Sequence, residues 1–121
     1  MILQILPHDN YRGLPCSIVA AGCALGYTEK KDILTLSPSG IHPDGYLPLE
    51  PANRFIRSLL PVKKRITYKR GERPHLWEFL CGNESKALVC VFGHLIYVDG
   101  ESYYSFFNNL NDDIVCIWIL S

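Results

Sequence analysis

The chain has 121 residues, of which 48% are hydrophobic and 20% are charged, and this composition indicates one compact domain spanning residues 1–121. Its 12 basic and 12 acidic residues cancel, so no net charge favours nucleic acid or an anionic membrane surface as a partner. The basic run from Lys63 to Arg73 is interpreted as a solvated edge, because no nucleic-acid recognition motif accompanies it.

No apolar segment reaches the length of a membrane-spanning helix, and the first ten residues are too short and uncharged for a secretory signal. We therefore expect a cytoplasmic protein with no membrane partner. The cysteines are odd in number and contain neither a CxxC pair nor Cys/His spacing typical of zinc sites. This disfavours a disulfide framework, and we expect no metal and no cofactor. The five are Cys16, Cys23, Cys81, Cys90 and Cys116.

The first elements in chain order are a strand and a helix. "ILQIL" at residues 2–6 predicts a short edge strand, followed by a loop rich in Pro, Gly, Asp and Asn. From Cys16 the apolar spacing is helical and Gly26 supplies a stop. This helix is rich in Ala and Gly, which lets another element approach closely. Ser37 to Pro51 is rich in Pro and Gly and predicts a long loop, which we expect to form a cleft wall or lid.

The rest of the chain predicts two more helices and then a β-sheet. Residues 50–61 and 73–83 have helical patterns, with Pro74 in the first turn and Gly82 at the end of the second. Residues 62–69 form a plausible strand between them. Three antiparallel strands are then predicted, in 86–98, 101–107 and 113–120. The expected fold class is α+β.

Cys16 and His94 are the candidate reactive pair. A cysteine in the first turn of a helix has its pKa lowered by free N–H groups and the helix dipole, a condition that Cys23 does not meet. His94 lies within an apolar strand and needs a polar partner, and Gly93 before it leaves room beside the strand. The alternatives are a buried packing thiol for Cys16 and, for His94, a core histidine bonded to a backbone carbonyl.

The turn that follows His94 suggests its neighbour. If Asp99 and Gly100 form a two-residue hairpin loop, counting back along both strands places His94 opposite Ser105, within hydrogen-bonding reach. A bulged hairpin would bring in Phe106 or Tyr104 instead.

The motif "N-x5-C-S-x2-A-A" at residues 10–21, followed by a Pro/Gly-rich loop, helices and "GHLIYVDGESYYSFF", resembles the papain-like cysteine peptidases in their minimal form. The most similar members are the small C39-like proteins of bacteria and bacteriophages. The resemblance implies an N-terminal helix packed on a C-terminal antiparallel sheet of about four strands. It also implies Cys16 as nucleophile, His94 as general base and Asn10 in the oxyanion hole, where the family usually has Gln. Asn10 also suits a turn.

The sequence departs from that family at the third catalytic position. Ser105 stands where Asp or Asn is expected, and serine cannot stabilise imidazolium by charge. Asn108 or Asn109 could substitute if the strand bends. Two functions follow: a cysteine hydrolase of peptidase or amidase type acting on a peptide or protein, or a weakened or inactive papain-like fold that binds a partner. The oligomeric state does not follow from the sequence.

Overall fold

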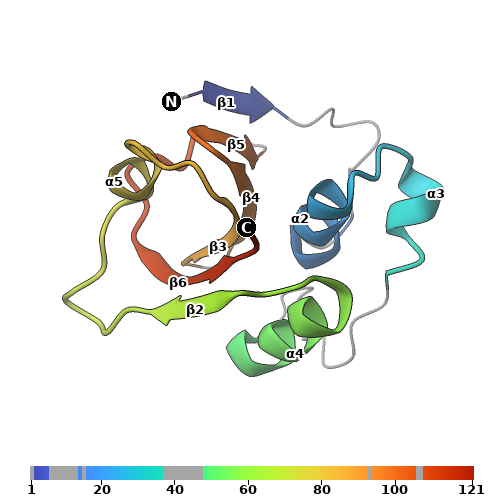
Figure 1. Ribbon diagram of the computed structural model, residues 1–121, viewed down its shortest axis with the longest axis horizontal. Coiled ribbons are helices and arrows are strands. Elements are labelled where there is room, and N and C mark those ends of the chain that lie inside the picture. The colour runs from blue at the N-terminus through green and yellow to red at the C-terminus, as the bar shows by residue number, and fades with distance from the viewer. Residues whose placement is uncertain (1, 6–13, 15, 37–47, 93, 106–107) are drawn as a thin grey trace.

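A computed structural model gives the structure of the chain and describes residues 2–5, 14, 16–36, 48–92, 94–105 and 108–121. These residues form helices and strands that pack together (Figure 1). The elements in chain order are β1 (Ile2–Ile5), α2 (Cys16–Leu25), α3 (Lys30–Ile33), α4 (Leu49–Leu59), β2 (Lys64–Thr67), α5 (Leu76–Leu80), β3 (Lys86–Val91), β4 (His94–Asp99), β5 (Ser102–Ser105) and β6 (Ile114–Ile119).

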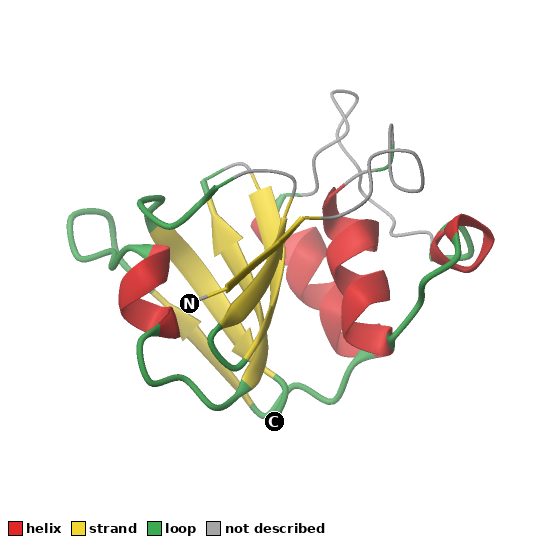
Figure 2. Cartoon of the chain, turned by 90° about the horizontal axis from the view of Figure 1, so that it is seen from above, coloured by secondary structure: helices red, strands yellow, loops and turns green. Residues whose placement is uncertain are grey.

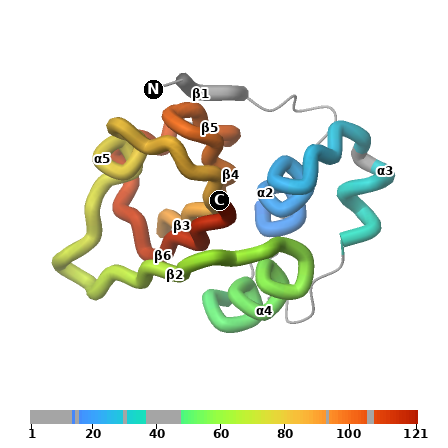
Figure 3. The backbone as a smooth tube through the Cα atoms, viewed as in Figure 1, coloured from blue at the N-terminus to red at the C-terminus, as the bar shows by residue number. Residues whose placement is uncertain are grey.

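The strands form one sheet in the order β1-β5-β4-β3-β6-β2. Strands β2 to β6 pair antiparallel, and β1 adds to one edge as a parallel neighbour of β5. The predicted α+β class and the edge position of the first strand are confirmed. The expected number of about four strands is too small, because β2 pairs with β6 at the far edge (Figure 3) and one predicted strand divides into two.

That division occurs in the apolar run of residues 86–98, which sequence reasoning took for one strand. β3 ends at Val91, β4 begins at His94, and the two pair antiparallel along their whole length. A largely apolar run does not reveal a hairpin, because two buried strands have the same apolar pattern as one long strand. His94 is consequently the first residue of its strand.

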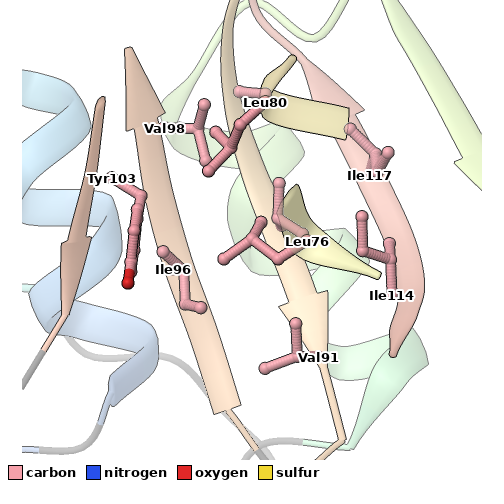
Figure 4. Close-up of a cluster of buried hydrophobic side chains, with 10 residues drawn as sticks. Leu76, Leu80, Val91, Ile96, Val98, Tyr103, Ile114 and Ile117 are labelled. Atoms are coloured by element: carbon pink, nitrogen blue, oxygen red, sulfur yellow. The ribbon is translucent and has the colours of Figure 1, made fainter. Parts of the chain in front are cut away.

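The sheet has two buried faces. Along β4, Ile96 and Val98 pack with Leu76 and Leu80 of α5 (Figure 4). The alternate residues of β4, Leu95 and Tyr97, pack on the other face with residues of α2 and α4. The sheet therefore lies between α5 and the helices that precede it (Figure 2). Alternation of side chains with a period of two produces this arrangement.

Helix α2 begins at Cys16 and ends before Gly26, as predicted, and Gly26 has φ +83°, a left-handed conformation that favours glycine. Gly22 within it faces α3: a Cβ built there would lie 2.9 Å from Cγ1 of the buried Ile33. The small residues thus permit the close approach that the sequence suggested, although α3 itself was not predicted.

The two later helices are shifted from their predicted bounds. α4 begins at Leu49, within the segment predicted to be a loop, and its N-cap is Pro48. α5 begins at Leu76 and not at Pro74, because the His75 side chain and Glu78 form a capping box at its N-terminus. Among the described residues, no helix is both long and apolar enough to span a membrane.

Candidate functional site

Cys16 and His94 line the same cavity. The cavity has a volume of about 560 Å³ and is lined by the starts of α2 and α4, the end of β3 and the start of β4. A second, much smaller pocket is lined by Cys16, His94 and Ser105 together with Tyr104. The fold therefore brings together three of the four predicted site residues. The fourth, Asn10, lies outside the described residues.

Two opposing effects act on the Cys16 thiol at the start of α2. Burial raises its pKa above the ordinary value of 9.0, and the backbone N–H groups of Leu95, Cys16 and Ser17 act in the opposite direction. The helix start therefore favours the thiolate, as the sequence predicted, but burial outweighs it. In the resting protein Cys16 is a thiol at neutral pH and needs a base to become a nucleophile.

His94, half-buried at the first position of β4, is in the protonation state that a base requires. Burial lowers the pKa of its imidazole below the ordinary value of 6.5, and the negative charge of Asp112 offsets part of this shift. The ring is consequently neutral at pH 7 and can accept a proton.

Ser105 contacts His94 as predicted, although the predicted hairpin register is wrong. Asp99 pairs with Ser102 and Tyr97 with Tyr104, which places the turn at Gly100 and Glu101. The register thus differs by two residues from the prediction, so residues keep their faces. Nε2 of His94 lies 3.3 Å from Oγ of Ser105 across the two strands.

Contacts with the segment between α5 and β3 account for the position of the turn. The Gly100 N–H donates to the Ser85 carbonyl at 3.1 Å, and Asn83 Nδ2 donates to the Gly100 carbonyl at 2.6 Å. Glu101 accepts a hydrogen bond from the Gly82 N–H at 2.7 Å. These contacts join residues that are distant in sequence. The prediction of a two-residue hairpin loop at "VDGE" used only neighbouring residues and so could not include them.

Behind Ser105, hydrogen bonds continue to a carboxylate. Ser105 Oγ donates to Asn109 Oδ1 at 2.5 Å, and Asn109 Nδ2 donates to Asp112 Oδ2 at 2.6 Å. Ser105 and Asn109 are buried, with 1% and 6% of their surfaces exposed, whereas Asp112 is exposed. We call the series His94, Ser105, Asn109 and Asp112 the relay.

The carboxylate of Asp112 sets the direction of every bond in the relay. A carboxylate only accepts hydrogen bonds, so the amide nitrogen of Asn109 faces it and the amide oxygen faces Ser105. The single hydroxyl proton of Ser105 then goes to Asn109, and Ser105 Oγ accepts the proton of His94 Nε2. In the neutral imidazole this leaves the lone pair on Nδ1.

The other candidates have structural contacts. Asn108 accepts hydrogen bonds from the Tyr103 hydroxyl and the Leu110 N–H, so of the two asparagines it is Asn109 that joins His94 through Ser105. Cys23 packs among apolar residues, and burial raises its pKa to about 11. Of the predicted lid, residues 37–47 lie outside the described residues, while Pro48 lines the cavity.

Sequence reasoning missed two charged residues of this region. Asp112 belongs to the loop "NNLND", where its spacing of three residues from Asn109 could have suggested a side-chain contact. Arg73 ends the basic run that was interpreted as a solvated edge, yet it lines the cavity. No local pattern distinguishes it from the other basic residues of that run.

Within the described part of the chain, no three His, Cys, Asp or Glu side chains are grouped so as to hold a metal ion. Comparison with models of known protein families, with curated proteins and with solved structures finds no match for this chain. The functional argument therefore depends on the site itself.

Proposed function

We propose that this protein is a small papain-like cysteine hydrolase of peptidase or amidase type, with Cys16 as nucleophile and His94 as general base. The observation that carries the proposal is the relay, which gives Ser105 an indirect connection to the carboxylate of Asp112. In triads of this kind the third group holds the imidazole in one tautomer and orientation. The relay can perform that part without a carboxylate in direct contact with His94.

In the proposed reaction His94 accepts the thiol proton of Cys16 at Nδ1 as the sulfur attacks the carbonyl carbon of an amide or ester. The tetrahedral intermediate collapses, the bond to the leaving group breaks, and the leaving amine or alcohol takes the proton from His94. Water then attacks the carbonyl carbon of the acyl-enzyme and gives a proton to His94. The carbon–sulfur bond breaks, and the proton returns from His94 to the Cys16 sulfur. The products are a carboxylic acid and an amine or alcohol.

Charge in this reaction develops on the carbonyl oxygen and on the imidazole. The Cys16 N–H at the start of α2 can donate to the oxyanion, because the first N–H groups of a helix have no intrahelical acceptor. For the imidazolium, Asp112 supplies a distant negative charge that already favours protonation of His94. Its exposure to solvent weakens this effect relative to a buried carboxylate.

The alternative function is binding by a fold that has lost its chemistry. The raised pKa of Cys16 and the neutral Ser105 beside His94 favour it. Both hypotheses require the same fold and the same cavity, so only chemistry separates them.

The test is formation and turnover of an acyl-enzyme. The protein is mixed with p-nitrophenyl acetate, quenched, and analysed by intact mass and peptide mapping. The proposal expects an acetyl group on Cys16 that disappears with time as ester is hydrolysed, and loss of both signals in Cys16→Ala and His94→Ala. Cys23→Ala is the matched control in the same helix and should behave as the parent. Acetylation spread over several cysteines, or unaffected by His94→Ala, would favour the binding alternative.

A further inference from the structure

The cavity beside Cys16 has an electropositive lining. Two helices begin at it, α2 at Cys16 and α4 at Leu49, so their positive dipole ends lie there. The N-cap of α4 is Pro48, which makes no side-chain capping bond, and the first turn of α2 contains no acidic residue. None of the described residues that line the cavity is Asp or Glu.

Arg73 adds a permanent positive charge to this lining. Its Nε is buried and has no hydrogen-bond partner, and no carboxylate of the described residues forms an ion pair with it. Glu50 in the first turn of α4 is instead bound to Arg65 at 3.1 Å. Arg73 lines the cavity together with Cys90 of β3. Arg73 as a whole is only partly buried, but its buried N–H donor is unfavourable without an acceptor.

A second unpartnered polar group lines the same cavity. Ser17 follows Cys16 in the first turn of α2 and is 3% exposed, and its Oγ has no hydrogen-bond partner. Buried hydroxyl groups in folded proteins are nearly always bonded. Ser17 and Arg73 are thus two residues of one cavity lining that each carry an unpartnered polar atom.

The remaining walls are apolar. Leu49, Leu95 and Trp118 contribute to them, and Trp118 is fully buried. Phe92, between β3 and β4, also lines the cavity and is 87% exposed, which is unusual for a large aromatic side chain. An apolar segment of a substrate would cover this surface and gain free energy by leaving water.

We propose that this cavity binds a substrate whose apolar segment carries a carboxylate, with Arg73 binding the carboxylate and the apolar walls holding the segment beside Cys16. The assignment of this molecule as a substrate rests on the proposed function. Arginine suits the task, because its planar guanidinium forms two parallel hydrogen bonds to one carboxylate.

The test compares three six-carbon N-methylamides that differ only at the far end, which is a carboxylate, a methyl group or an ammonium group. Their binding to Cys16→Ala protein, which cannot turn them over by the proposed route, is measured by titration in NMR spectra. We expect the carboxylate compound to bind at least about tenfold more tightly than the methyl compound, and the ammonium compound to bind most weakly.

Substitutions test whether Arg73 is the source of the preference for the carboxylate compound. Arg73→Gln should abolish it and Arg73→Lys should keep part of it, whereas Arg70→Gln, an exposed arginine of the same basic run, should leave it unchanged. Equal affinity for the three compounds, no binding of the carboxylate compound, or a preference that survives Arg73→Gln would overturn the inference. A carboxylate preference without acylation of Cys16 would refute only the hydrolase, and acylation without the preference would refute only this inference.

Discussion

Removal of the Ser105 hydroxyl is the perturbation that isolates the relay. In Ser105→Ala, His94 Nε2 loses an acceptor at 3.3 Å and Asn109 Oδ1 loses a donor at 2.5 Å. The first bond is long and worth little, whereas the second leaves a buried amide oxygen without that donor, at a cost of about 1–3 kcal/mol. The free energy of unfolding should fall by about that amount, measured by urea denaturation.

The effect on catalysis should be separable from the effect on stability. Loss of the group that orients a catalytic histidine lowers the rate by up to about 10⁴-fold where that group is a carboxylate. Because Ser105 is neutral and supplies orientation alone, we expect a decrease of about tenfold to a hundredfold in kcat/KM for p-nitrophenyl acetate, equivalent to about 1.4–2.8 kcal/mol.

Two variants control this experiment. Ser102→Ala, at the other end of β5, should change kcat/KM by less than about twofold, since Ser102 is outside the relay. Ser105→Thr keeps a hydroxyl and should recover part of the lost rate. If Ser105→Ala is folded by circular dichroism and hydrolyses the ester as fast as the parent, the orienting role of Ser105 is wrong.

Further predictions concern the relay and the ionisable groups. Asp112→Ala should lower kcat/KM severalfold and shift the acid limb of the pH profile to lower pH, because the negative charge that raises the pKa of His94 is removed. The control is Asp113→Ala, which removes the contact to His75 and should not shift that limb. Asn109→Leu should impair ester hydrolysis about as much as Ser105→Ala, and equal activity to the parent would exclude the relay beyond Ser105. The pKa of His94 is lower in the folded protein than in the unfolded chain, so its contribution to stability is complete above pH 6.5 and decreases as the pH falls toward the folded pKa. Thermal denaturation measured against pH should show this loss of stability, and the loss should be smaller in His94→Gln. The buried thiols of Cys23 and Cys90 have pKa values raised to about 11 and about 12, so they stabilise the fold fully below pH 9.0 and less as the pH rises through those values; a Tm independent of pH above 9.0 would contradict this.

Local patterns were sufficient to predict much of this fold. The helix α2, the first edge strand and the α+β class follow from spacing, a glycine stop and short β-branched runs. The pairing of β3 with β4 as a hairpin could not be predicted in this way, since both strands lie in one largely apolar run. Helix α3 has only four residues, too few for a periodic signal.

The candidate site was predictable in its members more than in its geometry. Cys16 was identified by its place at a helix start and His94 by its polarity in an apolar run, and both line one cavity. The link from Ser105 through Asn109 to Asp112 depends on the conformation of residues 108–113 before β6, which local patterns do not determine. Burial of the Cys16 thiol likewise depends on tertiary packing, which is why its raised pKa could not be read from the helix start alone.

Alkylation by iodoacetamide against pH tests most directly whether His94 activates Cys16. Peptide mapping follows all five cysteines, and Cys81 serves as the exposed thiol with no base assigned to it. We predict that at about pH 6 Cys16 reacts well ahead of Cys81 and of Cys23, with a midpoint below pH 6.5 that disappears in His94→Ala. Reaction of Cys16 only as the pH approaches and passes 9.0, at the same rate with and without His94, would contradict the account.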